Sequence, residues 1–206
     1  MQLPIPPLLV ISDRRRALRP LEELAEAAFA GGCRWFSLRE KDLPPERRLA
    51  LLAALVKRGW RWGATVTVHE DIEAAAAAGA CGVHLPSGTN PAAARARLPH
   101  GLIGASAHSA EEASAQLRAG ADYVTASPVF LTASKPGYGP ALGLDGLARI
   151  VEQVEGPVMA LGGISAKNAA LCLSAGAHGV AVMGEVMRAA DPRAAIKGIL
   201  DVLADR

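Results

Sequence analysis

The sequence predicts an α/β protein that folds as a single (β/α)8 TIM barrel. Short apolar segments alternate with amphipathic segments along the chain, and eight such pairs share its 206 residues. The short segments are apolar nearly throughout, as parallel strands are when both faces of the sheet are covered. Eight successive right-handed strand–helix units close most readily into a barrel. The alternative is a doubly wound open sheet, which usually has fewer strands and a glycine-rich first turn, whereas SDRRRAL (residues 12–18) follows the first strand here.

The apolar segments define the expected strands. In chain order they are residues 8–12, 34–38, 64–68, 82–85, 102–106, 122–127, 157–161 and 179–183. Each is four to six residues long and consists mainly of apolar residues, which is typical of a buried parallel strand. We therefore expect one domain over residues 1–206, with no linker that divides it.

The amphipathic segments define the expected helices. They are residues 20–30, 44–59, 70–78, 91–98, 109–119, 143–153 and 165–175, and one last helix follows the eighth strand. Pro20 and Pro45 stand in first turns, and Gly31 and Gly59 stand at helix ends, which is the usual distribution of these residues. The alanine run of residues 74–78 favours the third helix, and the fifth opens on a Ser-x-x-Glu capping box.

Composition excludes several classes of function. The chain has 22 basic and 20 acidic residues and a net charge of only +2, which does not suggest nucleic-acid binding. The sequence has no apolar run long enough for a membrane span and no signal peptide at its N-terminal end. Cys33, Cys81 and Cys172 lack metal-ligand spacing and are expected to be small core residues in a reducing compartment. We expect a soluble cytoplasmic protein.

The loops after the last two strands favour a phosphate site. In a (β/α)8 barrel the chemistry lies on the loops that follow the C-terminal ends of the strands. The segments LGGIS (161–165) and VMGEV (182–186) place glycines there, and backbone N–H groups beside glycine can approach an anion closely. The expected phosphate-binding residues are Gly162, Gly163, Met183, Gly184 and Glu185. The alternative is that these glycines only allow tight turns.

Two further loops carry polar residues. The loop PVFLTASKPGYG (128–139) is long for a strand–helix connection, and Thr132, Ser134 and Lys135 are expected to close over an anionic substrate, unless the loop is only a solvated lid. The loop in GVHLPSGTNP (82–91) carries Ser87, Gly88, Thr89 and Asn90 but no carboxylate. A loop that holds a divalent metal for diphosphate chemistry needs a carboxylate.

Five segments resemble one known family. SLREK, GVHLPSG, IGASAHSAEEA, DYVTASPVFLTASKPG and VMALGGISAKN occur in the order, spacing and strand positions of the thiamine-phosphate synthase/TenI family, from about residue 8 to residue 190. The resemblance implies a (β/α)8 barrel, in agreement with the pattern of strands and helices. It also implies two branches of activity. The synthase couples a pyrimidine diphosphate to a thiazole phosphate, with magnesium held by two aspartates. The TenI branch is a thiazole tautomerase.

The synthase pattern is only partly present. That branch has Gln-x-Arg-x-Lys after the second strand, and here Ser37 replaces the glutamine while Arg39 and Lys41 remain. It has Asn-Asp after the third strand, and here His69 and Glu70 stand in that place. The second aspartate falls in the loop that contains Ser87 to Asn90. Glu70, helped only by Asp71, makes a poor magnesium site.

The TenI branch resembles this chain more closely. Its members carry LPSG after the fourth strand and then a segment similar to ARLPHGLIGASAHSAEEA (96–113). The resemblance implies that His108, after the fifth strand, is the acid/base group that moves a proton in a carboxythiazole phosphate. One imidazole can both take and return a proton near neutral pH. The alternative is that His108 merely precedes the helix cap at Ser109.

Other polar residues at strand ends are expected to bind substrate. Arg39 and Lys41 would hold a carboxylate or phosphate, unless they only pair with Glu40 or Asp42 at the surface. His69 and Ser106 follow the third and fifth strands and are expected to contact substrate. His84 lies inside the fourth strand, where a hydrogen-bonded core residue is as plausible as a ligand, so it is not included.

Three functions stay open from the sequence. The leading one is a thiazole tautomerase that needs neither metal nor cofactor and acts on a phosphorylated thiazole. The second is a thiamine-phosphate synthase, which would need Mg²⁺. The third is a regulatory barrel that binds a thiazole or thiamine phosphate without turnover. The resemblance leaves a homodimer open, and no nucleic-acid or membrane partner is expected.

Overall fold

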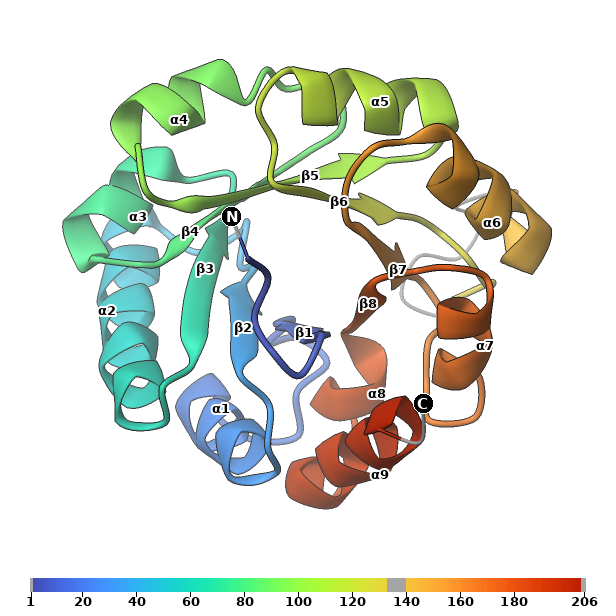
Figure 1. Ribbon diagram of the computed structural model, residues 1–206. Helices are drawn as coiled ribbons and strands as arrows, with labels where there is room; N and C mark the ends of the chain where they lie inside the picture. Colours follow the sequence, from blue (N-terminus) through green and yellow to red (C-terminus); the bar gives the residue numbers. More distant parts are fainter. Residues whose placement is uncertain (1, 133–139, 205–206) are drawn as a thin grey trace.

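The strands form a closed barrel in chain order. The computed structural model describes residues 2–132 and 140–204. Within them eight parallel strands pair in sequence, and β1 pairs with both β2 and β8 to close the ring (Figure 1). The predicted (β/α)8 fold is therefore confirmed. The strands are β1 (Leu8–Ile11), β2 (Trp35–Leu38), β3 (Thr65–His69), β4 (Gly82–Leu85), β5 (Leu102–Ala107), β6 (Tyr123–Ala126), β7 (Val158–Leu161) and β8 (Gly179–Val182).

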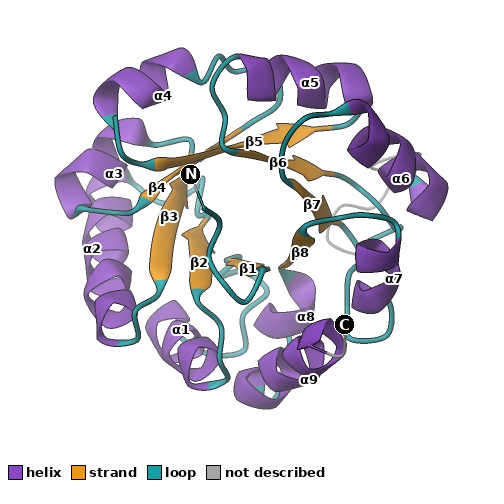
Figure 2. Cartoon of the chain, in the orientation of Figure 1, coloured by secondary structure: helices purple, strands orange, loops and turns teal. Residues whose placement is uncertain are grey.

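The helices form an outer layer around the strands (Figure 2). In chain order they are α1 (Leu21–Ala30), α2 (Pro45–Arg61), α3 (Ile72–Ala78), α4 (Ala92–Arg97), α5 (Ala110–Arg118), α6 (Gly143–Gln153), α7 (Ala169–Ser174), α8 (Gly184–Met187) and α9 (Pro192–Ala204). Apolar faces of these helices cover the strands, and the amphipathic pattern of the sequence reflects this one-sided burial. None of the described helices is long and apolar enough to cross a membrane.

Large side chains fill the barrel interior near the N-terminal ends of the strands. Trp35 and Tyr123 are fully buried there, with their ring centroids 4.8 Å apart in an edge-to-face arrangement. Gly104 makes room for them, because a Cβ atom at that position would lie 2.0 Å from the Tyr123 ring. Leu3 from the N-terminal segment packs on the same cluster, and this segment lies in front of the barrel opening in Figure 1. Side chains therefore fill the barrel at the N-terminal ends of the strands, and a cavity can form only at the C-terminal ends.

The last strand–helix unit differs from the prediction. The sequence suggested one final helix, whereas a short α8 is followed by the separate helix α9. The side chain of Asp191 accepts a hydrogen bond from the backbone N–H of Ala194 at 3.0 Å, and Pro192 follows it in the first turn of α9. A capping residue followed by proline begins a new helix, which explains the division.

Two predicted helices begin later than expected for similar reasons. Asp71 caps α3 by accepting a hydrogen bond from Ala74 N at 2.9 Å, so the helix begins at Ile72. Before α7, the side chain of Asn168 accepts a hydrogen bond from Ser165 N at 2.8 Å and holds a turn where the sequence predicted helix. Side chains that bond to nearby backbone compete with helix at these positions.

The cysteines are all free, and two of them behave as predicted. Cys33 and Cys172 are buried, and burial raises the pKa of their thiols to about 12 and about 11. Cys81 is exposed in the turn before β4, so the expectation that it is a core residue was wrong.

Candidate active site

The C-terminal ends of the strands surround a cavity of about 580 Å³. The sequence-predicted site residues that line it are Arg39, Lys41, His69, Ser106, His108, Thr132, Gly162, Gly163, Met183, Gly184 and Glu185. Ser134 and Lys135 lie outside the described residues. As expected for a (β/α)8 barrel, residues at the C-terminal ends of β2, β3, β5, β6, β7 and β8 meet around one cavity.

His108 lies between β5 and α5 and lines the cavity. Its Nδ1 is 2.6 Å from the backbone oxygen of Ser127. A carbonyl oxygen can only accept, so Nδ1 carries the proton in this contact, and the neutral ring then has its lone pair on Nε2. The helix cap is also present, because Ser109 Oγ accepts a hydrogen bond from Glu112 N at 3.2 Å. His108 is therefore a neighbour of a helix cap and also a cavity residue with a defined tautomer.

Glu112 links the loop after β4 to His108. One oxygen of its carboxylate accepts hydrogen bonds from the hydroxyl of Ser87, at 2.8 Å, and from the backbone N–H of His108, at 2.9 Å. The LPSG loop therefore lies against the same carboxylate that holds the backbone of the candidate acid/base residue. The capping-box pattern predicted Glu112 as a helix-start residue, but not its bond to Ser87.

His84 is a cavity residue that the sequence did not identify. It is 2% exposed, and its ring nitrogens lie 3.0 Å from the hydroxyl of Tyr123 and 3.1 Å from Oγ of Ser106. Burial, and then the charge of Arg39, lower the pKa of His84 to about 3, so the ring is neutral at physiological pH. From its position inside a strand, a core role and a ligand role are equally plausible. In this barrel the inward face of β4 is also the floor of the cavity.

Arg39 lines the cavity, and its backbone is held by a hydrogen bond. Its N–H donates to Oγ of Ser12 at 2.8 Å, and that hydroxyl donates in turn to the buried carboxylate of Glu40 at 2.7 Å. Burial raises the pKa of Glu40, although Ser12 and Arg14 act in the opposite direction. The loops after β1 and β2 are therefore locked together beneath Arg39.

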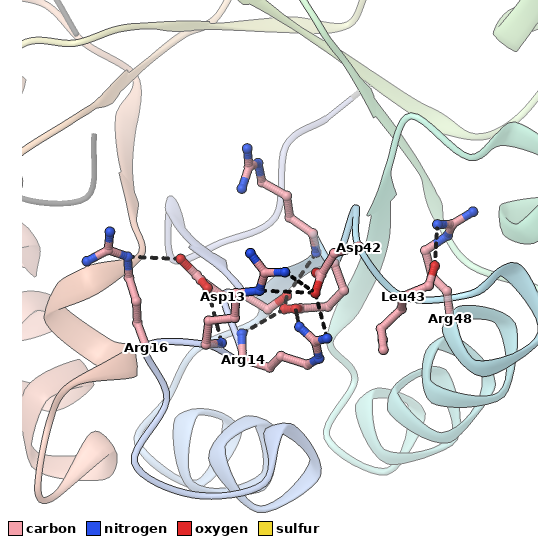
Figure 3. A network of polar contacts seen from close by, with 10 residues as sticks. Asp13, Arg14, Arg16, Asp42, Leu43 and Arg48 are labelled. Carbon is pink, nitrogen blue, oxygen red and sulfur yellow. Dashed lines mark hydrogen bonds and ion pairs between the residues drawn. The ribbon is translucent and has the colours of Figure 1, made fainter. Parts of the chain in front are cut away.

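A surface network surrounds this buried contact (Figure 3). The guanidinium of Arg14 lies 2.6 Å from the carboxylate of Asp42, and Arg16 pairs with Asp13 at 3.0 Å. The hydrogen bond from Arg14 lowers the pKa of Asp42. Among the described residues, Glu40 and Asp42 pair with Arg14 and Arg15 and not with Arg39 or Lys41, so the surface-pair alternative is not what the structure shows.

The carboxylates after β3 are already paired. Glu70 forms an ion pair with Lys41 and has a positive φ of 65°, a conformation that is uncommon for residues other than glycine. Asp71 contacts the guanidinium of Arg48 at 2.6 Å and caps α3. Burial acts to raise the pKa of Asp71, but the Ala74 N–H and Arg48 outweigh it, and the net shift is downward.

The loops after β3 and β4 offer a magnesium ion only two carboxylates, Glu70 and Asp71, and both are paired with cations. Mg²⁺ in phosphate chemistry is usually held by one or two carboxylates together with substrate oxygens and water. Within residues 2–132 and 140–204, no group of three or more His, Cys, Asp or Glu side chains is arranged to hold a metal ion. The loop after β4 supplies hydroxyl and amide groups but no carboxylate, and Glu70 and Asp71 are engaged by cations.

The glycines after β7 are required by the path of the backbone. Gly162 and Gly163 have φ values of 104° and 65°. A Cβ atom on Gly162 would lie 2.8 Å from Cα of Pro128, and one on Gly163 would lie 2.7 Å from the backbone oxygen of Leu131. The tight-turn alternative therefore explains why glycine is needed here. Since both residues also line the cavity, a role in phosphate binding is compatible with this requirement.

Comparison with known proteins gives the family. Residues 8–186 match the sequence family described as thiamine monophosphate synthase. The chain belongs to the thiamine monophosphate synthase family. A relative from Geobacter sulfurreducens, named putative thiamine-phosphate synthase, is 42% identical over 202 residues, which is 97% of this chain and 95% of the relative. A thiamine-phosphate synthase from Roseiflexus castenholzii is 40% identical over 96% of this chain and 88% of its own.

A solved structure agrees with this family. Thiamine phosphate pyrophosphorylase from Pyrococcus furiosus superposes with a TM-score of 0.88 at 35% identity, covering 96% of this chain and 95% of that one. Membership of the thiamine monophosphate synthase family was predicted and is confirmed. The relatives carry the synthase name, however, and none of them points specifically to the TenI branch that the sequence analysis placed first.

Proposed function

We propose that this member of the thiamine monophosphate synthase family moves a proton within a phosphorylated carboxythiazole, converting an exocyclic double bond into an aromatic ring. The observation that carries the proposal is the arrangement of His108, a residue of the cavity lining whose Nδ1 lies 2.6 Å from the Ser127 carbonyl oxygen. A group that both takes and returns a proton needs such a fixed orientation.

The proton shift can be written with His108 alone. Its Nε2 removes a proton from the ring carbon of the substrate, and the electron pair of that C–H bond moves through the ring to the exocyclic carbon. The imidazolium that forms keeps its Nδ1–H bond to the Ser127 carbonyl. Nε2–H then delivers the proton to the exocyclic carbon, which restores neutral His108 and leaves an aromatic thiazole. No atom is lost and no redox partner is needed.

The surrounding residues support binding of an anionic ring. Arg39 lines the cavity and supplies a planar cation suited to a carboxylate. Ser106, fixed by the neutral ring of His84, presents a hydroxyl to the same space. The loops that carry Gly162, Gly163 and Gly184 line the cavity elsewhere and offer backbone N–H groups to a phosphate. These roles are part of the proposal.

The first test measures aromatisation of the thiazole tautomer by purified protein in the presence of EDTA. We expect turnover without added metal, and we expect His108→Ala to lower kcat about 10²- to 10⁴-fold, the usual contribution of positioned acid–base catalysis. His100→Ala is a matched control, because His100 is an exposed histidine outside the cavity lining. Full activity of the His108 variant would contradict the mechanism.

The second candidate function is the thiamine-phosphate synthase reaction. The names of the relatives at 42% and 40% identity favour it. It predicts Mg²⁺-dependent release of diphosphate from the pyrimidine substrate in the presence of thiazole phosphate. The same preparation should be assayed for both reactions, with and without Mg²⁺. Diphosphate release without tautomer turnover would replace the first proposal by the second, and saturable ligand binding with neither product would indicate the regulatory barrel.

A further inference from the structure

A cation that the sequence analysis did not select lines the cavity at its glycine-rich side. Arg188 directly follows α8, and it shares the cavity lining with Gly162, Gly163 and Gly184. No pattern in the sequence points to it, because it lies five residues beyond the end of the predicted strand and not at the strand end itself.

The guanidinium of Arg188 lies across the first residue of α8. Residues four apart on a helix are neighbours, and helical side chains lean toward the N-terminal end. A Cβ atom on Gly184 would lie 2.4 Å from Nη1 of Arg188 and 2.9 Å from its Cζ. Because Gly184 has no side chain, the guanidinium of Arg188 can occupy the space beside it.

The charge of Arg188 is available to a ligand. Within residues 2–132 and 140–204, no carboxylate forms an ion pair with Arg188, and Glu185, which also lines the cavity, is not bonded to it. Lys41, by contrast, is engaged by Glu70. Two arginines therefore line the cavity, Arg39 after β2 and Arg188 after β8. These two strands are not neighbours in the barrel, because β1 lies between them.

We propose that Arg188 binds the phosphate group of the ligand and that Arg39 is thereby left for its carboxylate. This inference rests on the proposed function, since it assigns the two anionic groups of that substrate to two arginines. A guanidinium grips phosphate through two parallel N–H bonds, and the glycines beside Arg188 let the phosphate approach the backbone closely. Arg188 is then a specificity-determining residue: it selects phosphorylated ligands over their unphosphorylated counterparts.

The test measures binding without turnover. Calorimetric titration with inorganic phosphate and with the thiazole phosphate that lacks a carboxylate gives the affinity of each variant. We expect Arg188→Ala to weaken both about ten- to hundredfold, the usual range for hydrogen bonds to a charged group. Arg188→Lys should fall between this variant and the original chain, because it keeps the charge but loses the paired geometry.

Two controls make the result specific. Arg39→Ala should leave the affinity for inorganic phosphate within about twofold, because its proposed partner is the carboxylate. Arg193→Ala removes an exposed arginine of α9 that does not line the cavity and should also change nothing. Unchanged phosphate affinity in Arg188→Ala would overturn the inference, as would an equal loss in Arg39→Ala. Neither result depends on whether the protein catalyses the proton shift.

A double-variant cycle tests the position of the head group. Gly184→Ala should displace the guanidinium and weaken phosphate binding about as much as Arg188→Ala does. If that displacement is the only effect, the combined variant should bind no more weakly than Arg188→Ala alone. A full additional loss would show that the two residues act independently and would contradict the proposed placement. Thermal unfolding of each variant confirms that it is folded.

Discussion

At the scale of single residues, His84 shows how burial fixes a protonation state. The ring lies on the cavity floor between the hydroxyls of Tyr123 and Ser106, and its pKa is lowered to about 3 by burial and by Arg39. An ordinary imidazole, with a pKa near 6.5, becomes protonated at a much higher pH than His84 does. A neutral ring can both donate and accept, so it can orient the Ser106 hydroxyl that faces the cavity.

This shift predicts how stability depends on pH. Between about pH 6.5 and pH 3 the unfolded chain binds a proton at residue 84 that the folded chain does not, so the free energy of unfolding rises with pH in this range. The His84 contribution is fully present above pH 6.5 and is lost on acidification, by at most about 1.4 kcal/mol per pH unit. Urea denaturation at a series of pH values should therefore give a smaller slope for His84→Gln.

Comparison with a second histidine isolates the cause of that slope. His100 is exposed and lies outside the cavity lining, so His100→Gln should keep the slope of the original chain. If the His84 and His100 variants lose stability in parallel as the pH falls, the neutral state of His84 is not responsible and the interpretation fails.

Single residues were also where prediction from sequence was weakest. For His84 the sequence does not distinguish a core residue from a ligand, and only the closed barrel reveals that this face of β4 borders the cavity. Arg188 was missed for a different reason. Its place at the site depends on α8 being a single turn that brings residue 188 back toward the cavity, and no local pattern reports that.

At the scale of elements, the start of α5 joins two loops into one unit. Glu112 receives hydrogen bonds from Ser87 in the loop after β4 and from the backbone of His108. The carboxylate also lies in the first turn of α5, where the helix dipole favours negative charge. One side chain thus stabilises the helix and holds the backbone that carries the candidate catalytic ring.

We expect Glu112→Ala to affect both stability and turnover. Loss of two hydrogen bonds to a carboxylate should lower the free energy of unfolding by about 2 to 4 kcal/mol, somewhat less where the groups are reached by water. Because the His108 backbone is then released, kcat for the proton shift should fall while KM changes little. Denaturant unfolding measures the first effect and steady-state kinetics the second.

Glu111 provides the matched control for this prediction. It is an exposed acidic residue in the same first turn, and the Ser109 hydroxyl lowers its pKa, but no contact ties it to Ser87. Glu111→Ala should therefore keep kcat and lose only a small part of the stability. Equal effects of the two variants on kcat would mean that charge at the helix start matters and the link between loops does not.

The elements themselves were largely predictable. Each observed strand lies within about a residue or two of the predicted one, since burial on both faces leaves an unbroken apolar segment between turn residues. The helices were less well predicted at their starts. Asp71, Ser165 and Asn168 compete for the backbone there, and such local hydrogen bonds are decided by three-dimensional geometry that periodicity does not contain.

At the scale of the whole molecule, the barrel separates a packed end from a reactive end. Trp35, Tyr123 and Met159 fill the interior near the N-terminal ends of the strands, and the cavity occupies the opposite end. The hydroxyl of Tyr123, a residue of the packed cluster, contacts His84, which lines the cavity. The packed cluster therefore lies directly beneath the cavity. Packing inside the barrel therefore determines the depth of the cavity as well as the stability of the fold.

Gly104 is the position where this packing is most directly testable. A Cβ atom there would lie 2.0 Å from Cζ of Tyr123, and the ring is fully buried, so it has no open space to enter. Gly104→Ala should lower the free energy of unfolding by about 1 to 3 kcal/mol or more, the usual cost of overpacking a core. The change must also disturb the bond between Tyr123 and His84, and we expect weaker ligand binding as a second effect.

Gly198→Ala is the matched control, and we expect it to raise the free energy of unfolding where Gly104→Ala lowers it. Gly198 lies inside α9, and a Cβ atom there would meet nothing within 4 Å. Alanine is a better helix former than glycine, so this variant should gain about 0.5 to 1 kcal/mol. Urea midpoints of the two variants should therefore move in opposite directions. A Gly104 variant as stable as the original chain would show that the interior yields easily and that the Tyr123 ring does not set the cavity floor.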